Sequence, residues 1–365
     1  MVFSLKARME EQVRHQDETF LFSISLPCGH STNWLQKDGE VFEIGRAASK
    51  IFGTYKKKVL EEKGIRVNLA VEMNATIFWG EASKKDLVSI IKELANNSFE
   101  NEKFNQAKKQ AINDLKHNYR NDEYKALFKS YELIFYNQQF NFQEFILSHR
   151  KLKVESLKFI QNNIVTEENV YIFIDGEFEK EAVEGILPRT IENQSMIVFP
   201  TINKRFNFDY RVNLRGHLND EYLIVKFNSS ILDTISKEKE FLILTFWGQR
   251  CFGRNYSVFN HFSNKAICGI RKKGLPMDIE RSMITENVFD EIKTIIISSF
   301  ERLANTNDGK LAILKGKLRM DRLDWNKLQQ ELEKINLQDV LVYLEKCTIQ
   351  YGQITFSGEL NNYGR

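Results

Sequence analysis

Apolar residues in alternating or continuous runs predict the β-strands of this chain. Every second residue from Phe20 to Leu26 is large and apolar, which is the two-residue period of a half-buried strand. Residues 170–178 are β-branched or aromatic at nearly every position and meet a glycine at Gly176, so they predict a buried strand. Further strands are predicted over residues 2–9, 65–71, 75–79, 210–214, 222–227, 256–261, 265–270 and 349–360.

Apolar residues with a helical period predict the helices. Ser83 and Thr285 are predicted N-caps, because a hydroxyl there can accept a hydrogen bond from an orphan amide. Residues 27–39 are interpreted as a polar loop, and the basic run Lys56-Lys57-Lys58 as a solvated helix face. The predicted helices span residues 40–63, 83–94, 100–118, 122–137, 154–162, 179–187, 237–252, 285–303 and 337–346.

The two halves of the chain share one pattern. Gly176-Glu177-Phe178 and Gly358-Glu359-Leu360 lie 182 residues apart (358 − 176), about half of the 365 residues, and each ends a helix-then-strand segment. This period predicts two tandem domains of one fold, residues 1–189 and 207–365, joined by a linker over 190–206. Each domain is expected to be α+β, with helices packed on a largely antiparallel sheet.

Composition excludes several classes of protein. Apolar residues make up 42% and charged residues 28%, and the net charge of +3 comes from interspersed acids and bases, so nucleic acid is not an expected partner. The four cysteines are isolated, which favours reduced thiols. No apolar run approaches the roughly 20 residues of a membrane helix, and the N-terminus lacks a signal-peptide core. We therefore expect a cytoplasmic protein with no membrane span.

Four stretches carry a resemblance to a known family. They are residues 45–68 with Phe52-Gly53-Thr54, residues 75–87, residues 104–115, and residues 249–258 with Tyr256-Ser257-Val258. With the order of elements and the duplication, they resemble the pitrilysin/insulysin family of zinc metallopeptidases, in its short branch that includes the mitochondrial processing peptidase. The resemblance implies a clamshell made of two similar subunits.

The metal motif of that family is degenerate here. Members bind zinc through His-x-x-Glu-His on a helix and a later Glu. The matching positions are Ala48, Ile51 and Phe52, with Asp114 at the later one. Alanine, isoleucine and phenylalanine have no metal-binding atom, and none of the six histidines has another one helical turn away. We predict that the chain holds no metal and is not a peptidase on its own; the resemblance implies that zinc sits in a partner subunit.

Part of a second family motif survives. In the family an Arg and a Tyr hydrogen-bond the substrate backbone and the developing oxyanion. Tyr256 matches the Tyr, whereas the Arg position falls on Gln249, with Arg250 and Arg254 nearby. Two readings stay open. Arg250 and Tyr256 face a cavity and bind substrate together with Arg254, or they are a surface Arg and an interface Tyr.

Three functions follow from these observations. The first is a non-catalytic subunit of a heterodimeric zinc metallopeptidase, which binds peptide along a sheet edge for a zinc-bearing partner and serves maturation of a ribosomally made peptide, such as a bacteriocin. The second is a purely structural scaffold subunit of a complex with no proteolytic role. The third is an enzyme of altered chemistry, which would require scattered histidines to converge in space.

Overall fold

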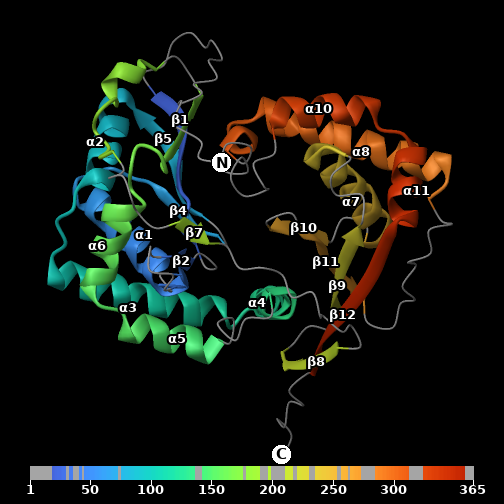
Figure 1. Cartoon of the computed structure of the whole chain (residues 1–365), viewed down its shortest axis with the longest axis horizontal. Coiled ribbons are helices and arrows are strands. Elements are labelled where there is room, and N and C mark those ends of the chain that lie inside the picture. Colours follow the sequence, from blue (N-terminus) through green and yellow to red (C-terminus); the bar gives the residue numbers. More distant parts are fainter. Residues whose placement is uncertain are drawn as a thin grey trace, which may run out of the picture. The chain divides into compact units, whose positions relative to one another are not determined.

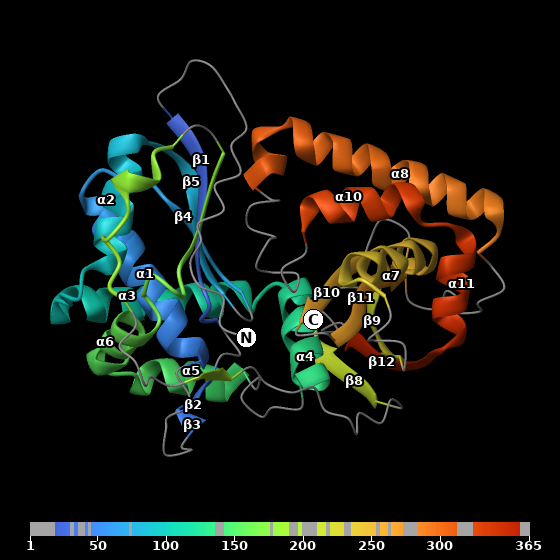
Figure 2. The same ribbon diagram turned by 45° about the horizontal axis from the view of Figure 1, so that its top comes forward.

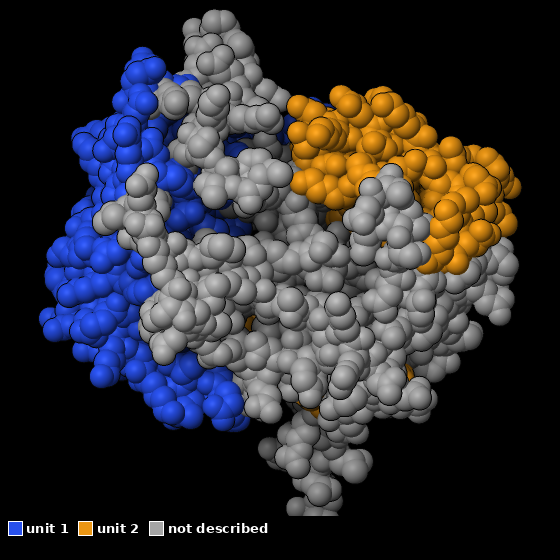
Figure 3. Space-filling view, in the orientation of Figure 1, with its two compact units in different colours: residues 1–117, 142–200, 303–319 blue, residues 118–141, 201–302, 320–365 orange. Residues whose placement is uncertain are grey.

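The computed structural model describes most of the chain. The described residues are 19–29, 33–35, 41–42, 45–72, 75–135, 142–175, 178–189, 196–198, 210–216, 220–229, 235–252, 256–261, 264–272, 284–311 and 324–357. The chain forms two compact units, marked in Figure 3. Unit 1 contains residues 1–117, 142–200 and 303–319, and unit 2 contains the remainder. Segment 118–141 comes from the first half of the chain but belongs to unit 2, and segment 303–319 comes from the second half but belongs to unit 1. The predicted linker over 190–206 stays a prediction.

The sheet of unit 1 is antiparallel throughout. Its order is β4 (Asn68–Val71), β5 (Thr76–Ser83), β1 (Thr19–Leu26) and β6 (Tyr171–Asp175). A separate small sheet joins β3 (Val41–Phe42), β2 (Asn33–Leu35) and β7 (Met196–Val198). The strands predicted around residues 20–26, 65–71, 75–79 and 170–178 are confirmed; the one predicted over 2–9 lies outside the described residues.

Helices cover one face of the unit 1 sheet, as Figure 1 shows. They are α1 (Gly45–Glu62), α2 (Lys84–Ala95), α3 (Asn101–Asn118), α5 (Phe142–Lys151) and α6 (Val154–Asn163). Phe22, Ile24 and Leu26 of β1 pack against them in one core, because alternate residues of a strand share a face. Ser83 accepts a hydrogen bond from Asp86 N, so the predicted cap of α2 is confirmed.

The structure corrects several predictions for unit 1. β1 is buried on both faces, since Ser23 and Ser25 on its second face are also buried, whereas β6 is mostly half-buried. Residues 179–187 do not form an α-helix but a 3₁₀ turn, Lys180–Ala182, because Gly185 adopts φ +73° and ends the segment. The predicted polar loop contains β2, the predicted linker contains β7, and α5 was not predicted.

Unit 2 has a five-stranded sheet. Its order is β10 (Tyr256–His261), β11 (Asn264–Lys272), β9 (Asp220–Ser229), β12 (Cys347–Ser357) and β8 (Tyr210–Arg215). Neighbours are antiparallel except β12 and β8. The prediction of a largely antiparallel sheet is therefore confirmed in both units.

The helices of unit 2 form two layers over this sheet. They are α7 (Lys237–Phe252), α8 (Glu286–Asn305), α10 (Trp325–Lys334) and α11 (Leu337–Glu345), and the unit also contains α4 (Asp122–Phe135). Figure 2 shows α7 between the sheet and the pair α8 and α10. In that position α7 is buried on nearly all sides, and its Phe246 stacks on Phe289 of α8 with ring centroids 4.6 Å apart.

The internal repeat is visible in the elements. The succession α5, α6 and β6 in the first half returns as α10, α11 and β12 in the second. The matching elements end 183 (334 − 151), 182 (345 − 163) and 182 (357 − 175) residues apart, close to the predicted interval, although β12 begins six residues earlier than that interval would place it. The α+β class with duplicated domains is therefore confirmed. No helix in the described part of the chain combines the length and the apolar character needed to cross a bilayer.

Candidate functional site

The three predicted metal positions on α1 lie inside the hydrophobic core. Ala48, Ile51 and Phe52 are completely buried and belong to the core cluster of unit 1. Their spacing of three and four residues puts them on one face of the helix, toward the other core helices. Methyl, sec-butyl and phenyl groups offer no electron pair to a metal, so these residues do not fit a zinc ion. Among the described residues, no three His, Cys, Asp or Glu side chains are grouped to hold one.

Asp114, the fourth predicted position, meets a different residue of α1. Its Oδ2 lies 4.0 Å from Nζ of Lys50, and the two side chains are 44% and 19% exposed. Lys50 follows Ala48 by two residues, roughly 200° around the helix, and so faces away from Ala48 and Phe52. The structure thus brings Asp114 to an ammonium group and does not place it with the other three predicted positions.

Burial and charge act on Lys50 in opposite directions. Burial lowers the pKa of its ammonium group, the carboxylate of Asp114 raises it, and the positive charge of Lys57 lowers it further. Lys50 was not predicted as a site residue, because the family motif concerns only His and Glu positions. The available signal was a single charged residue inside the otherwise uncharged segment 47–53, since a lysine there must lie on a different face of the helix from the core residues.

Strand β4, on which α1 packs, offers an edge of the sheet. Among the described strands, β4 pairs only with β5. Glu72 N donates to Ala75 O at 2.8 Å, which fixes which residues of β4 bond to β5. Because hydrogen-bonded and non-bonded pairs alternate in an antiparallel ladder, the amides and carbonyls of Leu69 and Val71 point away from β5. Such an outward row is a template for adding another strand.

A glycine brings α1 close to this edge. A Cβ atom on Gly53 would lie 2.8 Å from Leu69 Cδ1 and 3.2 Å from Thr76 Cγ2, so a larger residue here would require the side chain of Leu69 to shift. Lys50 lies one turn earlier on α1, and its carbonyl accepts a hydrogen bond from Thr54 Oγ1 at 2.8 Å. Lys50 thus lies one turn before the point where α1 packs on β4 and β5.

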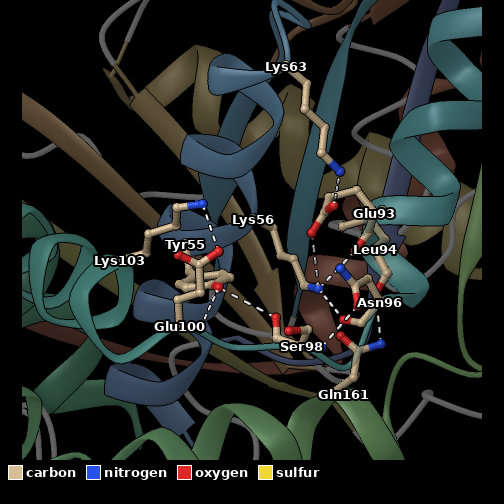
Figure 4. A network of polar contacts seen from close by, with 10 residues as sticks. All are labelled: Tyr55, Lys56, Lys63, Glu93, Leu94, Asn96, Ser98, Glu100, Lys103 and Gln161. Atoms are coloured by element: carbon tan, nitrogen blue, oxygen red, sulfur yellow. Dashed lines mark hydrogen bonds and ion pairs between the residues drawn. The ribbon is translucent and has the colours of Figure 1, made fainter.

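A buried polar network braces α1 against α2 (Figure 4). Lys56 is completely buried and donates to Glu93 O at 2.8 Å and to Asn96 O at 2.5 Å; its Nζ lies 3.7 Å from Glu93 Oε1. Lys63 also pairs with the carboxylate of Glu93. The interpretation of the basic run as a solvated face is wrong for Lys56, because the orphan carbonyls at the end of α2 need donors.

The second predicted motif lies in unit 2. Arg250 is half-buried in the last turn of α7, and Tyr256 is the first residue of β10, which pairs only with β11 among the described strands. Both residues thus flank the connection between α7 and β10, two elements that pack against each other. Arg254 lies outside the described residues. A shared cavity for Arg250 and Tyr256 stays a prediction.

The fold matches that of solved peptidases. An M16-like peptidase from Alicyclobacillus acidocaldarius superposes with a TM-score of 0.69 at 12% identity over 97% of each chain. The peptidase M16 inactive domain from Pseudomonas fluorescens gives 0.60 at 12% identity over 95% of each chain. A chain of Complex III2 from Candida albicans gives 0.65 at 12% identity, over 95% of this chain and 93% of the other. No family model and no curated protein matches the sequence.

These likenesses establish the fold. The chain is built like half of an M16-type peptidase, which is the architecture that the resemblance to the pitrilysin/insulysin family implied. The solved structures with this architecture include a domain described as inactive.

Proposed function

We propose that this protein is the non-catalytic subunit of a heterodimeric zinc metallopeptidase of the short pitrilysin/insulysin branch, and that it binds peptide substrate for a zinc-bearing partner. One observation carries the proposal. The helix that would supply the metal ligands has Ala48, Ile51 and Phe52 buried in the core, while the neighbouring edge strand β4 keeps an outward row of backbone groups. An open strand edge next to a helix that offers no metal ligands at these positions supports a subunit that binds peptide without cutting it.

Peptide binding would use the outward side of β4. An extended chain laid beside this strand would exchange hydrogen bonds with the backbone of Leu69 and Val71. Such bonds recognise any peptide backbone, so they suit a protein that positions varied extended segments. Sequence preference would come from the side chains on either side of the edge.

Unit 2 would contribute the surviving motif. Arg250 and Tyr256 are both hydrogen-bond donors at the end of α7 and the start of β10. In the proposed heterodimer they complete the partner's site, where a hydroxyl and a guanidinium group stabilise the substrate carbonyl as negative charge develops on it. Arg254 would assist in the same region. The substrate is an extended or unfolded peptide, and we place the protein in the cytoplasm, in maturation of a ribosomally made peptide such as a bacteriocin.

The test is co-purification with a zinc-bearing relative, followed by cleavage of a fluorogenic peptide by each chain alone and by the pair. The proposal expects cleavage by the pair well above that of either chain. In the pair, Tyr256→Phe or Arg250→Ala should lower kcat/KM by roughly a hundredfold, the usual loss for one oxyanion donor. Arg120→Ala, which changes an exposed arginine of the loop after α3, is the matched control and should change nothing. Chelator-sensitive cleavage by this chain alone would refute the proposal.

A scaffold role is the alternative, favoured by the likeness to a chain of Complex III2. A scaffold subunit would form a stable complex in which Tyr256→Phe and Arg250→Ala have no effect on any cleavage. A stable pair that cleaves no peptide in the same assay would support this alternative over the peptidase subunit.

A further inference from the structure

Lys50 is a largely buried cation for which the described part of the chain provides no hydrogen-bond acceptor within reach of Nζ. Within the described part of the chain, the one charged group it pairs with is the carboxylate of Asp114, and 4.0 Å separates Nζ from Oδ2, which is beyond hydrogen-bond length. Its ammonium group has three N–H donors. Nζ is not among the fully buried, unpartnered polar atoms of the described residues, and 19% of the side chain is exposed. The donors of Lys50 are therefore available to water or to a ligand that approaches from solvent.

Two contacts fix the backbone of α1 around Lys50. Thr54 holds the carbonyl of Lys50, and Gly53, one turn further on, packs against Leu69 and Thr76. The side chain consequently starts from a rigid part of α1, the helix that packs on β4. Its 19% exposure leaves a solvent-facing route to it.

We propose that Lys50 is a peptide subsite, whose ammonium group donates a hydrogen bond to a backbone carbonyl oxygen of an extended peptide added along β4. This inference rests on the proposed function and adds a residue to the same site. Lys50 is a positioning residue for the peptide, since it touches substrate without taking part in bond cleavage.

The charges around Lys50 favour a neutral acceptor over an anion. Asp114 lies on one side of it, and Lys57, two turns along the same face, is paired with Glu61 at 3.6 Å. The local charge is therefore balanced, and a carboxylate arriving at Lys50 would be repelled by Asp114. A carbonyl oxygen accepts a hydrogen bond without adding charge. The same ammonium group repels a divalent cation at Asp114, consistent with the poor fit of these residues to zinc.

The test measures binding of a fluorescein-labelled peptide of about 12 residues, alternating Val and Thr between terminal lysines, to the full chain by anisotropy. Lys50→Met should weaken binding by roughly 10- to 100-fold, the value of one hydrogen bond to a charged group. Lys50→Arg should restore most of it, because a guanidinium group also donates. Lys57→Met removes a lysine from the same helix face and should bind like the unchanged chain.

A second measurement uses the unaltered protein. Acetylation of lysines, followed by mass spectrometry, should proceed several-fold more slowly at Lys50 when the peptide is saturating, and at the same rate at Lys57. Equal acetylation of Lys50 with and without bound peptide, or wild-type affinity in a folded Lys50→Met chain, would overturn the inference.

A third variant distinguishes failure of the Lys50 subsite from failure of the proposed function. Val71→Pro removes an outward amide of β4 and should abolish peptide binding if the edge is used. Lost binding in Val71→Pro with unchanged binding in Lys50→Met would refute the subsite and leave the proposed function standing. Absence of any binding by the unaltered chain, alone and with its partner, would refute both.

Discussion

Nζ of Lys56 lies 2.8 Å from the carbonyl oxygen of Glu93, so a side chain of α1 closes the C-terminal end of α2. The last carbonyls of a helix have no partner within it, and a cation is the most favourable one. The rings of Phe99 and Phe52 lie 4.9 and 5.6 Å from the same ammonium group. This arrangement fixes α2 against α1, the helix that packs on the edge strand β4.

Replacing Lys56 should destabilise unit 1. Lys56→Met removes the donor to the carbonyls of Glu93 and Asn96 and leaves the carboxylate of Glu93 with Lys63 alone. Loss of one partner from a buried charged pair costs about 3–5 kcal/mol in unfolding free energy. Urea denaturation measures it. Lys57→Met is the control, since the exposed pair of Lys57 with Glu61 is worth less than about 1 kcal/mol; equal loss in both variants would contradict the assigned role.

The same lysine predicts a pH dependence. Burial lowers the pKa of Lys56 in the folded protein from 10.5 to about 8, although Glu93 opposes the shift. Between these two values the unfolded chain binds a proton at Lys56 that the folded chain does not. Stability contributed at this position should therefore rise as the pH rises from about 8 to 10.5.

The difference in unfolding free energy between the unaltered chain and Lys56→Met isolates this effect, because other groups cancel. The difference should be smallest below pH 8 and increase through pH 10. A difference that is constant over that range, or one that falls, would show that Lys56 titrates near its ordinary pKa.

Proline substitutions test which backbone groups of β4 face outward. Val71→Pro removes an amide that points away from β5, so we expect a stability loss of less than about 1 kcal/mol together with lost peptide binding. Ala70→Pro removes an amide that bonds to β5 opposite Ile77 and should cost about 3 kcal/mol. A larger loss from Val71→Pro than from Ala70→Pro, read from urea denaturation, would mean that the hydrogen-bond alternation of β4 is opposite to the one inferred from Glu72 and Ala75.

The sequence was sufficient for the elements whose pattern is local. β1, α2 and α8 were each found, because their signals lie within the element itself: the two-residue period before Leu26, the cap at Ser83 and the helical period after Thr285. The helix predicted after residue 178 failed because Gly185 takes a left-handed conformation, which a helical spacing of apolar residues does not reveal.

The site was less predictable because it depends on contacts distant in sequence. That Ala48, Ile51 and Phe52 bind no metal follows from their chemistry alone. That Asp114 instead meets Lys50, 64 residues earlier (114 − 50), follows only from the packing of α3 against α1. The burial of Lys56 likewise depends on where α2 ends, since an identical lysine next to it is left partly exposed.

Restoring histidines to the motif should not restore a metal site. Ala48→His with Phe52→His recreates a pair one turn apart, but both positions are completely buried in an apolar core. The larger side chain at residue 48 would overpack the core, and both rings would lose hydrogen bonds to water, each change costing about 1–3 kcal/mol. The expected result is a destabilised chain with no stoichiometric zinc, measured by urea denaturation and by metal content after dialysis.

We expect no zinc site because residues 48 and 52 face away from the remaining candidate ligand. Asp114, the remaining candidate ligand, is on the side of α1 that carries Lys50, so the two histidines would face away from it. A triple variant that also changes Lys50→Ala is the sharper control, because it removes the ammonium group that repels a cation at Asp114. If the triple variant bound one zinc ion with micromolar or better affinity, α1 would have to rotate relative to α3, and the core packing assigned to Ala48 and Phe52 would be wrong.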